Sequence, residues 1–122
     1  MDIKLINITK LYKSTGENYI KSLDGVNIDI NYGSYISFVG PSGSGKTTLL
    51  NIITGNLKPT SGEVYWGKIP LTKTSDKKIS QIRREKFGIV FQDIKFIPEL
   101  TVMDNILLPL VINYIPMASK KQ

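Results

Sequence analysis

A chain of 122 residues is long enough for one domain and no more, and a hydrophobic content of 41% is compatible with a packed core. The chain contains neither cysteine nor histidine, which excludes disulfides, thiolate metal sites and the commonest general base. No apolar run approaches the length of a membrane span, and the N-terminal residues lack a signal-like apolar stretch. We therefore expect a cytosolic protein.

The net charge of +6 raises the question of an anionic partner. The densest basic region, residues 68–86, also holds Asp76 and Glu85 and has no aromatic residue that could stack on a base. This pattern favours a solvated protein surface over a nucleic-acid patch, and no nucleic-acid partner is expected.

Five segments have the pattern of β-strands. Residues 3–12 and 26–30 alternate apolar and polar side chains, which predicts half-buried strands on either side of a turn at 14–18. The runs "YISFVG" (35–40) and "FGIVFQ" (87–92) are almost wholly apolar, which predicts strands buried on both faces, as in a parallel sheet. Residues 62–67 predict a further short strand.

A first helix is predicted over residues 46–54, directly after the glycine-rich loop that follows the apolar run 35–40. It would place Leu49, Leu50, Ile52 and Ile53 on one broad side and stop at Gly55. The alternation of strands, loop and helix indicates an α/β fold with an antiparallel accessory portion.

Two further helices are predicted from their start signals. Ser75 is a candidate cap for a polar helix over 75–86, with Ile79 and Ile82 facing inward. Thr101 and Asp104 form an approximate capping box for a helix over 102–108, which Pro109 should kink or end.

The loop "GPSGSGKT" (40–47) matches the pattern G-x-x-x-x-G-K-[ST] in full. Glycines at Gly40 and Gly45 let the backbone approach a ligand, and successive N–H groups can form a nest for anionic oxygens. Lys46 can reach the β- and γ-phosphates, Thr47 can ligate Mg²⁺, and Thr48 is placed to touch the α-phosphate. The alternative is a glycine-rich turn with a chance lysine, but the buried run before it and the helix after it favour a nucleoside triphosphate site.

The motifs "GPSGSGKTTLLNIITG", "PTSGEV", "GIVFQ" and "PELTVMDNILLPL", in this order, closely resemble the first half of an ATP-binding cassette (ABC) ATPase. The resemblance runs from about residue 3 to about residue 110, and it is greatest to the macrolide-exporter, lipoprotein-releasing and antimicrobial-peptide-resistance branch. It implies a P-loop NTPase core of the ABC type with an N-terminal antiparallel β portion, truncated before or within the helical subdomain. Residues 1–122 would be the N-terminal part of one nucleotide-binding domain, with its P-loop at 40–48, its Q-loop from 92 and a frayed end at 117–122.

The same resemblance implies site residues. Tyr12 matches the aromatic that stacks on adenine, and Gln92 matches the Q-loop glutamine that reaches the Mg²⁺ or the attacking water. By themselves, Tyr12 would equally be an ordinary strand aromatic and Gln92 a plain polar residue at a strand end. The implied catalytic residues are Lys46 and Gln92, and the implied metal ligands are Thr47 and Gln92. The residues implied to bind ATP are Tyr12, Gly40, Ser42, Gly43, Ser44, Gly45, Lys46, Thr47 and Thr48.

The implied partners are a transmembrane permease subunit, met by residues 92–100, and a second nucleotide-binding domain in a head-to-tail dimer. Phe96 and Ile97 would suit the permease interface if exposed, although burial in the core is nearly as compatible with their type. The protein would then lie on the inner face of the cell membrane, bound to its permease. It would bind Mg-ATP and, when complete, hydrolyse it to drive export or release of a substrate, which nothing in the chain indicates.

The chain departs from the family in two respects. Ser34 stands where the family usually has glutamate after Gly33, and we expect little consequence. Residues 1–122 also hold no L-S-G-G-Q signature, no apolar strand ending in Asp-Glu and no switch histidine. We therefore expect these residues alone to bind nucleotide without turning it over. That departure keeps open a nucleotide-binding or regulatory module, while the segment after Gln92 favours a transporter over an ABC-type protein acting on nucleic acid.

Overall fold

The computed structural model describes residues 1–14, 16–92 and 96–114, with only the backbone for 109–114. The chain forms two compact units, Met1–Ile79 and Ser80–Gln122. The frayed end expected at 117–122 lies outside the described residues.

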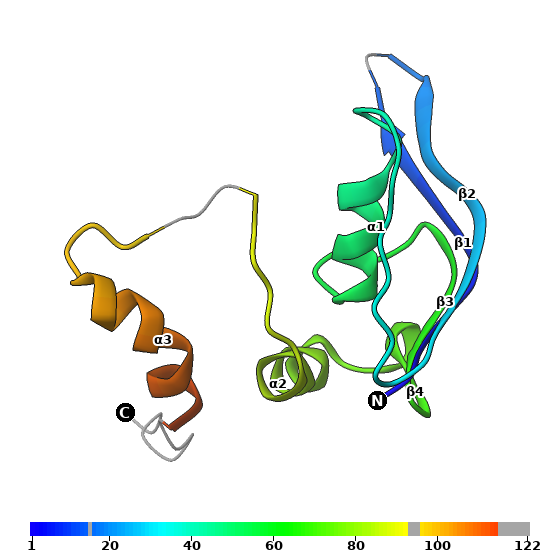
Figure 1. Cartoon of the computed structure of the whole chain (residues 1–122). Coiled ribbons are helices and arrows are strands. Elements are labelled where there is room, and N and C mark those ends of the chain that lie inside the picture. The colour runs from blue at the N-terminus through cyan, green and yellow to red at the C-terminus, as the bar shows by residue number, and fades with distance from the viewer. Residues whose placement is uncertain (15, 93–95, 115–122) are drawn as a thin grey trace. The chain divides into compact units, whose positions relative to one another are not determined.

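The first unit is built on a four-stranded antiparallel sheet (Figure 1). Strand β1 (Ile3–Lys13) pairs with β2 (Tyr19–Ile30) on one side and β3 (Ser61–Trp66) on the other, and β4 (Ile69–Pro70) pairs with β3. The register places Leu5 opposite Ile28 on β2 and opposite Val64 on β3. The predicted antiparallel portion is thus confirmed, with β2 longer than the sequence pattern indicated.

Helix α1 (Lys46–Ile53) lies against this sheet and closes the core (Figure 1). The buried side chains come from both layers: Leu5, Ile8, Leu23, Val64 and Trp66 from the strands, and Leu49, Ile52 and Ile53 from the helix. Leu50 was predicted to share that buried side but is 49% exposed. At about 100° per residue, Leu50 is turned to the edge of the stripe that the other three residues form.

One buried side chain ties the end of α1 to the sheet. Trp66 is fully buried, and its Nε1 donates a 2.8 Å hydrogen bond to the carbonyl of Ile53. This bond satisfies one of the carbonyls that the last turn of a helix leaves without a partner. Gly55 follows in the left-handed conformation (φ 67°), as expected for a residue that ends a helix.

The remaining helices begin where their caps predicted. A 3₁₀ turn, η1 (Leu71–Lys73), leads to α2 (Asp76–Lys86), where the N–H of Lys78 donates to Ser75 Oγ at 3.4 Å. At the start of α3 (Val102–Tyr114), Thr101 Oγ1 bonds the Asp104 carboxylate at 2.6 Å and accepts the Asp104 N–H at 3.1 Å. Ile79 and Ile82 are both buried, as predicted.

Two predicted strands are absent. Residues 35–40 and 87–92 form no strand, because no segment of the described chain pairs with either. Val39 and Val90 are consequently 92% exposed rather than buried on two faces. Of the two effects expected of Pro109, a kink or an end, the end does not occur, since α3 continues to Tyr114. A proline inside a helix removes one N–H donor, and the turns on either side keep theirs.

No helix in the described part of the chain combines the length and the hydropathy needed to cross a bilayer.

Candidate functional site: the loop before α1

The loop at residues 40–45 ends in a glycine that caps α1. Gly45 is the N-cap residue in the left-handed conformation (φ 88°, ψ 4°), and its carbonyl accepts the Leu49 N–H at 2.8 Å. No side chain caps the helix. The N–H groups of the first turn, which have no acceptor within a helix, are therefore left for an external acceptor, and the positive end of the helix dipole favours an anion there.

The loop is packed too closely for a side chain at Gly45. A Cβ there would lie 2.5 Å from the carbonyl oxygen of Ser22 on β2, and the left-handed φ of 88° also disfavours any other residue. A Cβ on Gly40 would lie 2.7 Å from Ser44 Oγ, so the Ser44 hydroxyl would have to turn away. At Gly45, the glycine of the predicted phosphate-binding loop is thus matched by a backbone path that only glycine allows.

Lys46 folds back over the loop. Its Nζ donates to the carbonyls of Gly40 (2.7 Å) and Pro41 (2.6 Å) and to Ser44 Oγ at 3.2 Å. An ammonium has three donors, so these three oxygens account for all of them. The side chain thus places one positive charge inside the curve of the loop. A bound anion would replace the loop's own oxygens as the acceptor of the ammonium hydrogen bonds.

The aromatic residue predicted to stack on a base lies beside the first turn of α1. The hydroxyl of Tyr12 on β1 is 3.4 Å from Thr48 Oγ1, and Lys10 Nζ lies 5.5 Å from the centre of the Tyr12 ring. The Tyr12 side chain is 41% exposed, so part of the ring is accessible to a ligand. The structure therefore brings Tyr12 to the same place as the residues of the loop, although all of β2 lies between them in sequence.

Sequence reasoning missed one residue of this group. Ser22 on β2 donates from Oγ to Thr48 Oγ1 at 3.1 Å, at a half-buried position. No motif marks a serine within a strand, and its approach to α1 depends on how the helix lies on the sheet. Thr47, the predicted Mg²⁺ ligand, is exposed one residue before Thr48, and Ser42 and Gly43 lie in the exposed turn of the loop.

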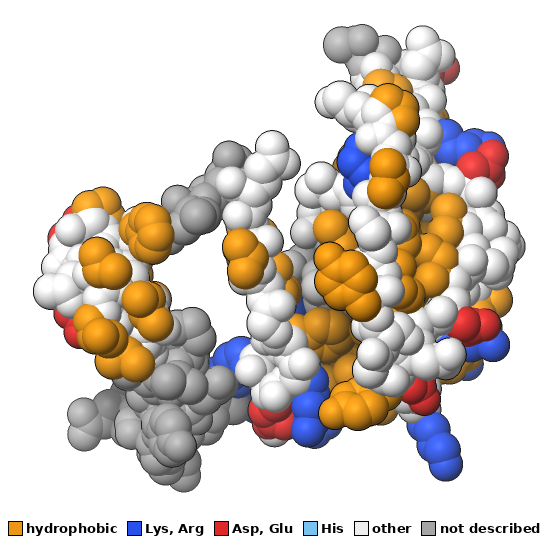
Figure 2. Space-filling model, in the orientation of Figure 1, with side chains coloured by type: hydrophobic (Ala, Val, Ile, Leu, Met, Phe, Trp, Pro, Cys, Tyr) orange, Lys and Arg blue, Asp and Glu red, His pale blue; other side chains and the backbone are white. Residues whose placement is uncertain are grey.

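A hollow of about 510 Å³ lies next to the loop. Gly40, Pro41 and Lys46 form one part of its wall, and the rest is largely apolar, with Leu23, Val26, Phe38, Val39 and Leu49. The space-filling view shows hydrophobic side chains at the surface of the first unit (Figure 2). The apolar side of residues 37–39 faces this hollow instead of a neighbouring strand, which accounts for the exposure of Val39.

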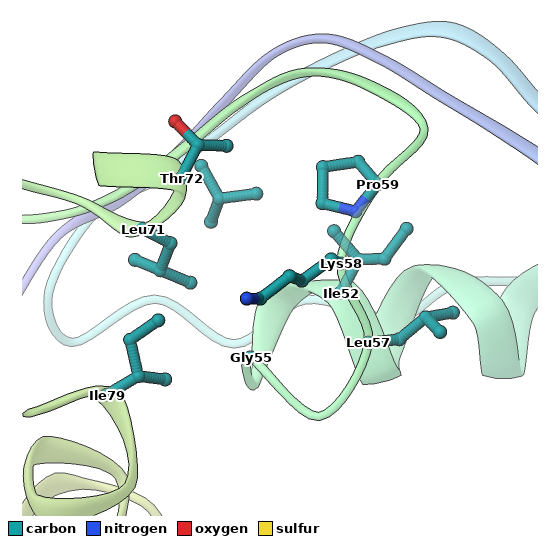
Figure 3. A pocket seen from close by; sticks show the side chains of 9 residues that line it. Ile52, Gly55, Leu57, Lys58, Pro59, Leu71, Thr72 and Ile79 are labelled. Atoms are coloured by element: carbon teal, nitrogen blue, oxygen red, sulfur yellow. The ribbon is translucent and has the colours of Figure 1, made fainter. Parts of the chain in front are cut away.

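A second, much smaller cavity of about 30 Å³ lies between α1, β3 and η1 (Figure 3). Ile52, Leu57, Leu71 and Ile79 line it, and the Lys58 side chain extends across it to pair with Asp76 at 2.7 Å. Its volume would hold about one water molecule, and its lining offers almost no polar partner. This cavity is a gap in packing and is too small for a nucleotide.

Gln92 and the segment after it belong to the second unit. Gln92 is exposed at a bend, and residues 93–95 lie outside the described part. Because Gln92 and the loop residues belong to different units, the predicted role of Gln92 at the metal ion stays a prediction. Phe96 and Ile97 are 62% and 39% exposed, so of the two alternatives, exposure and burial in the core, the structure shows exposure.

The loop that carries Phe96 and Ile97 is held by a residue that the sequence did not mark. The Asn105 side chain on α3 accepts from the Ile97 N–H, and its Nδ2 lies 3.0–3.2 Å from the carbonyls of Ile97, Leu100 and Thr101, so its two N–H groups are shared among three acceptors. Residues 96–101 are therefore ordered around one amide group.

Comparison with known proteins gives the same assignment along most of the chain. The family model described as ABC transporter matches residues 23–122. The uncharacterized ABC transporter ATP-binding protein MJ0796 of Methanocaldococcus jannaschii is 49% identical over 112 residues, which are 92% of this chain and 47% of that protein. The lipoprotein-releasing system ATP-binding protein LolD of Saccharophagus degradans is 38% identical over 98% of this chain and 52% of its own length.

The fold agrees with a solved structure as well. The dimeric structure of a post-hydrolysis state of the ATP-binding cassette MJ0796, bound to ADP and Pi, superposes with a TM-score of 0.87 at 47% identity. The superposition covers 93% of this chain and 49% of that one. The chain spans about half the length of the relatives that it matches. With the phosphate-type loop, the antiparallel sheet beside it and these matches together, the chain belongs to the ABC transporter family of ATP-binding cassette proteins.

Proposed function

We propose that the chain is the ATP-binding portion of the ATPase subunit of an ABC transporter. The observation that supports this most directly is the loop at residues 40–45, where a lysine ammonium, the N-terminus of α1 and an accessible aromatic ring converge. Each part suits one part of Mg-ATP: amides and ammonium the phosphates, and the ring the base. The relatives named ATP-binding proteins support the same nucleotide.

The loop fits a polyphosphate by its donors and by its space. The amides of residues 43–48 and the Lys46 ammonium would hold the phosphates, since these donors have no carboxylate competing for them among the described residues around the loop. On binding, Lys46 would exchange the carbonyls of Gly40 and Pro41 for phosphate oxygens. A charged acceptor makes the stronger hydrogen bond, so the exchange is favourable.

Mg²⁺ would enter with the nucleotide. The described residues contain no group of three acidic side chains that could hold a metal ion by themselves. Mg²⁺ keeps several waters and is commonly held by one or two protein oxygens plus substrate phosphates. The exposed Thr47 hydroxyl is the proposed protein ligand at the loop, and Gln92 is the proposed second one.

In the complete protein, the bound nucleotide would be hydrolysed, and the energy used to export or release a substrate through a permease. Residues 92–100 are the proposed permease-facing segment, because Phe96 and Ile97 expose apolar surface there. The protein would work as a head-to-tail pair of cassettes on the inner face of the membrane. The dimeric cassette to which this chain is similar supports such a pair.

Calorimetric titration of Mg-ATP tests the proposal. Lys46→Ala should abolish binding or weaken it greatly, because the γ-phosphate loses its cation. Lys68→Ala removes the same charge at an exposed position on the turn after β3 and serves as the matched control. Equal affinities of the wild-type protein and Lys46→Ala would rule out the loop as the nucleotide site.

A further inference from the structure

Three hydroxyl groups from three different elements meet at the first turn of α1. Ser22 on β2 donates to Thr48 Oγ1 at 3.1 Å, and the hydroxyl of Tyr12 on β1 lies 3.4 Å from the same oxygen. Thr48 is the third residue of α1, next to the proposed Mg²⁺ ligand Thr47. The sheet thus contacts the proposed phosphate site through side-chain hydroxyls and not only through its core.

The direction of the Ser22 hydrogen bond decides what Thr48 can do. A hydroxyl has one proton to donate and two lone pairs that accept. Because Ser22 donates to Thr48, it occupies a lone pair and leaves the Thr48 proton for another acceptor, either the Tyr12 hydroxyl at 3.4 Å or a ligand oxygen. A phosphate oxygen only accepts, so it can bond Thr48 only through that proton.

We infer that Ser22 is a positioning residue of the nucleotide site, which holds the Thr48 hydroxyl so that it donates to a phosphate oxygen of the bound nucleotide. This inference rests on the proposed ATP-binding function and adds to it a residue outside the loop. Ser22 does not touch the nucleotide itself; it acts through Thr48. The Tyr12 hydroxyl lies 3.4 Å from the same Thr48 oxygen.

The backbone fixes Ser22 in this position. Its carbonyl oxygen lies where a Cβ on Gly45 would be, at 2.5 Å, and the neighbouring Leu23 is 7% exposed, with its Cδ2 3.0 Å from the same point. β2 therefore packs directly against the end of the loop at this residue. The backbone of Ser22 is thus ordered beside α1 in the folded chain, so forming the bond to Thr48 fixes only the Ser22 and Thr48 side chains.

The test is a double-mutant cycle on Ser22 and Thr48, measured by calorimetric titration of the full protein with Mg-ATP and Mg-ADP. Ser22→Ala should weaken both nucleotides by the same factor, about two- to tenfold, the usual range for one neutral hydrogen bond. The factor should be the same because both nucleotides carry the α-phosphate to which the Thr48 hydroxyl is proposed to donate. Lys46→Ala, in contrast, should affect ATP more than ADP.

In a Thr48→Val background, Ser22→Ala should have no further effect, because its partner is already absent. Ser22→Cys keeps the size of the side chain but offers only a weak donor, so it should lose affinity as alanine does. Ser34→Ala removes another hydrogen-bonded serine hydroxyl, which donates to the Asn31 carbonyl at 2.7 Å, and should leave both affinities unchanged.

The outcomes separate the two proposals. If Ser22→Ala and Ser22→Cys bind as the wild type does, or if Ser22→Ala costs the same factor with and without Thr48, the role of Ser22 is refuted while ATP binding stands. If the wild-type protein binds neither nucleotide, the proposed function fails and the inference with it. Circular dichroism of each variant shows whether a loss of affinity is a loss of fold.

Discussion

The side-chain amide of Asn105 bonds the backbone of Ile97 at both ends: Oδ1 accepts the Ile97 N–H at 2.8 Å, and Nδ2 donates to the Ile97 carbonyl at 3.1 Å. A side chain that pairs with both groups of one residue copies the pairing of a β-ladder. Nδ2 also lies within hydrogen-bond distance of the carbonyls of Leu100 and Thr101, so the same amide contacts the end of the loop. The exposed Ile97 side chain is thus presented on a fixed backbone.

Removing this amide should loosen residues 96–101 without unfolding α3. In Asn105→Ala, the amide hydrogen of Ile97 loses its acceptor. Because one hydrogen bond stabilises the closed loop by about 1 kcal/mol, this hydrogen should exchange with solvent at least several-fold faster. Asn105→Asp keeps the acceptor and loses the donors, so it should protect Ile97 but leave its carbonyl unpaired. Hydrogen exchange resolved by residue is the measurement.

Met103→Ala is the control for Asn105, since Met103 is 62% exposed in the same turn and has no part in these bonds. In the Met103→Ala variant, the amide hydrogen of Ile97 should exchange at the wild-type rate. Equal protection of Ile97 in Asn105→Ala and in the wild type would show that the loop is ordered by something other than Asn105.

Two glycines of the phosphate-type loop should differ sharply when replaced by alanine. Gly45→Ala places a Cβ 2.5 Å from the backbone of Ser22 at φ 88°, so the loop must move and Mg-ATP binding should be lost. Gly43 has a similar φ of 79° but no atom within 4 Å of the added Cβ. Gly43→Ala should therefore cost only about 1–2 kcal/mol, the penalty of the left-handed conformation.

Thermal melting and nucleotide titration of the two variants measure this difference. Similar losses in Gly43→Ala and Gly45→Ala would mean that the backbone conformation, and not the contact with β2, sets the requirement for glycine.

The ring of Tyr12 should contribute more to nucleotide binding than its hydroxyl. Tyr12→Ala is expected to weaken adenine nucleotides by about 1–3 kcal/mol, the range for stacking of a base on an aromatic side chain. Tyr12→Phe should bind almost normally, because its hydroxyl bond to Thr48 is long at 3.4 Å. Titration with Mg-ATP distinguishes the two, and equal losses in both variants would point to the hydroxyl instead.

Phe96 and Ile97 should matter for coupling and not for nucleotide affinity. Both are exposed on the segment proposed to face the permease. In the complete protein with its permease, Phe96→Ala or Ile97→Ala should reduce transport strongly while leaving Mg-ATP affinity unchanged. Tyr32→Ala, which removes an 83% exposed aromatic ring from the first unit, is the control and should transport normally.

Site-directed crosslinking checks the same surface independently of activity. Crosslinkers placed at Phe96 and Ile97 should capture the permease. If they capture nothing while crosslinkers on other faces do, the permease-facing segment has been placed wrongly.

The sequence predicted those parts of the fold that local chemistry determines. Alternating side chains predicted β1, and the caps at Ser75 and Thr101 predicted where α2 and α3 begin. The glycine spacing predicted the loop, and the family resemblance predicted that Tyr12 lies near it.

The sequence did not predict what depends on a neighbour. An apolar run such as residues 35–40 becomes a strand only when another strand pairs with it, and the described chain contains none that does. Ser22 and Asn105 act through partners 26 residues and up to eight residues away, respectively. Their roles follow from how α1 lies on the sheet and how the loop before α3 folds back, which no local pattern specifies.

Trp66 is the one tryptophan of the chain, and its indole bonds to the last residue of α1, the helix whose first residue is Lys46. Eight helical residues span about 12 Å, so the indole ring contacts the opposite end of α1 from the glycine-rich loop. Indole emission changes with the polarity and hydrogen bonding of its surroundings. The protein therefore carries its own optical reporter on the far end of the nucleotide helix. A movement of α1 that breaks or lengthens the bond between the indole and Ile53 should therefore shift the emission wavelength of Trp66, without an added label.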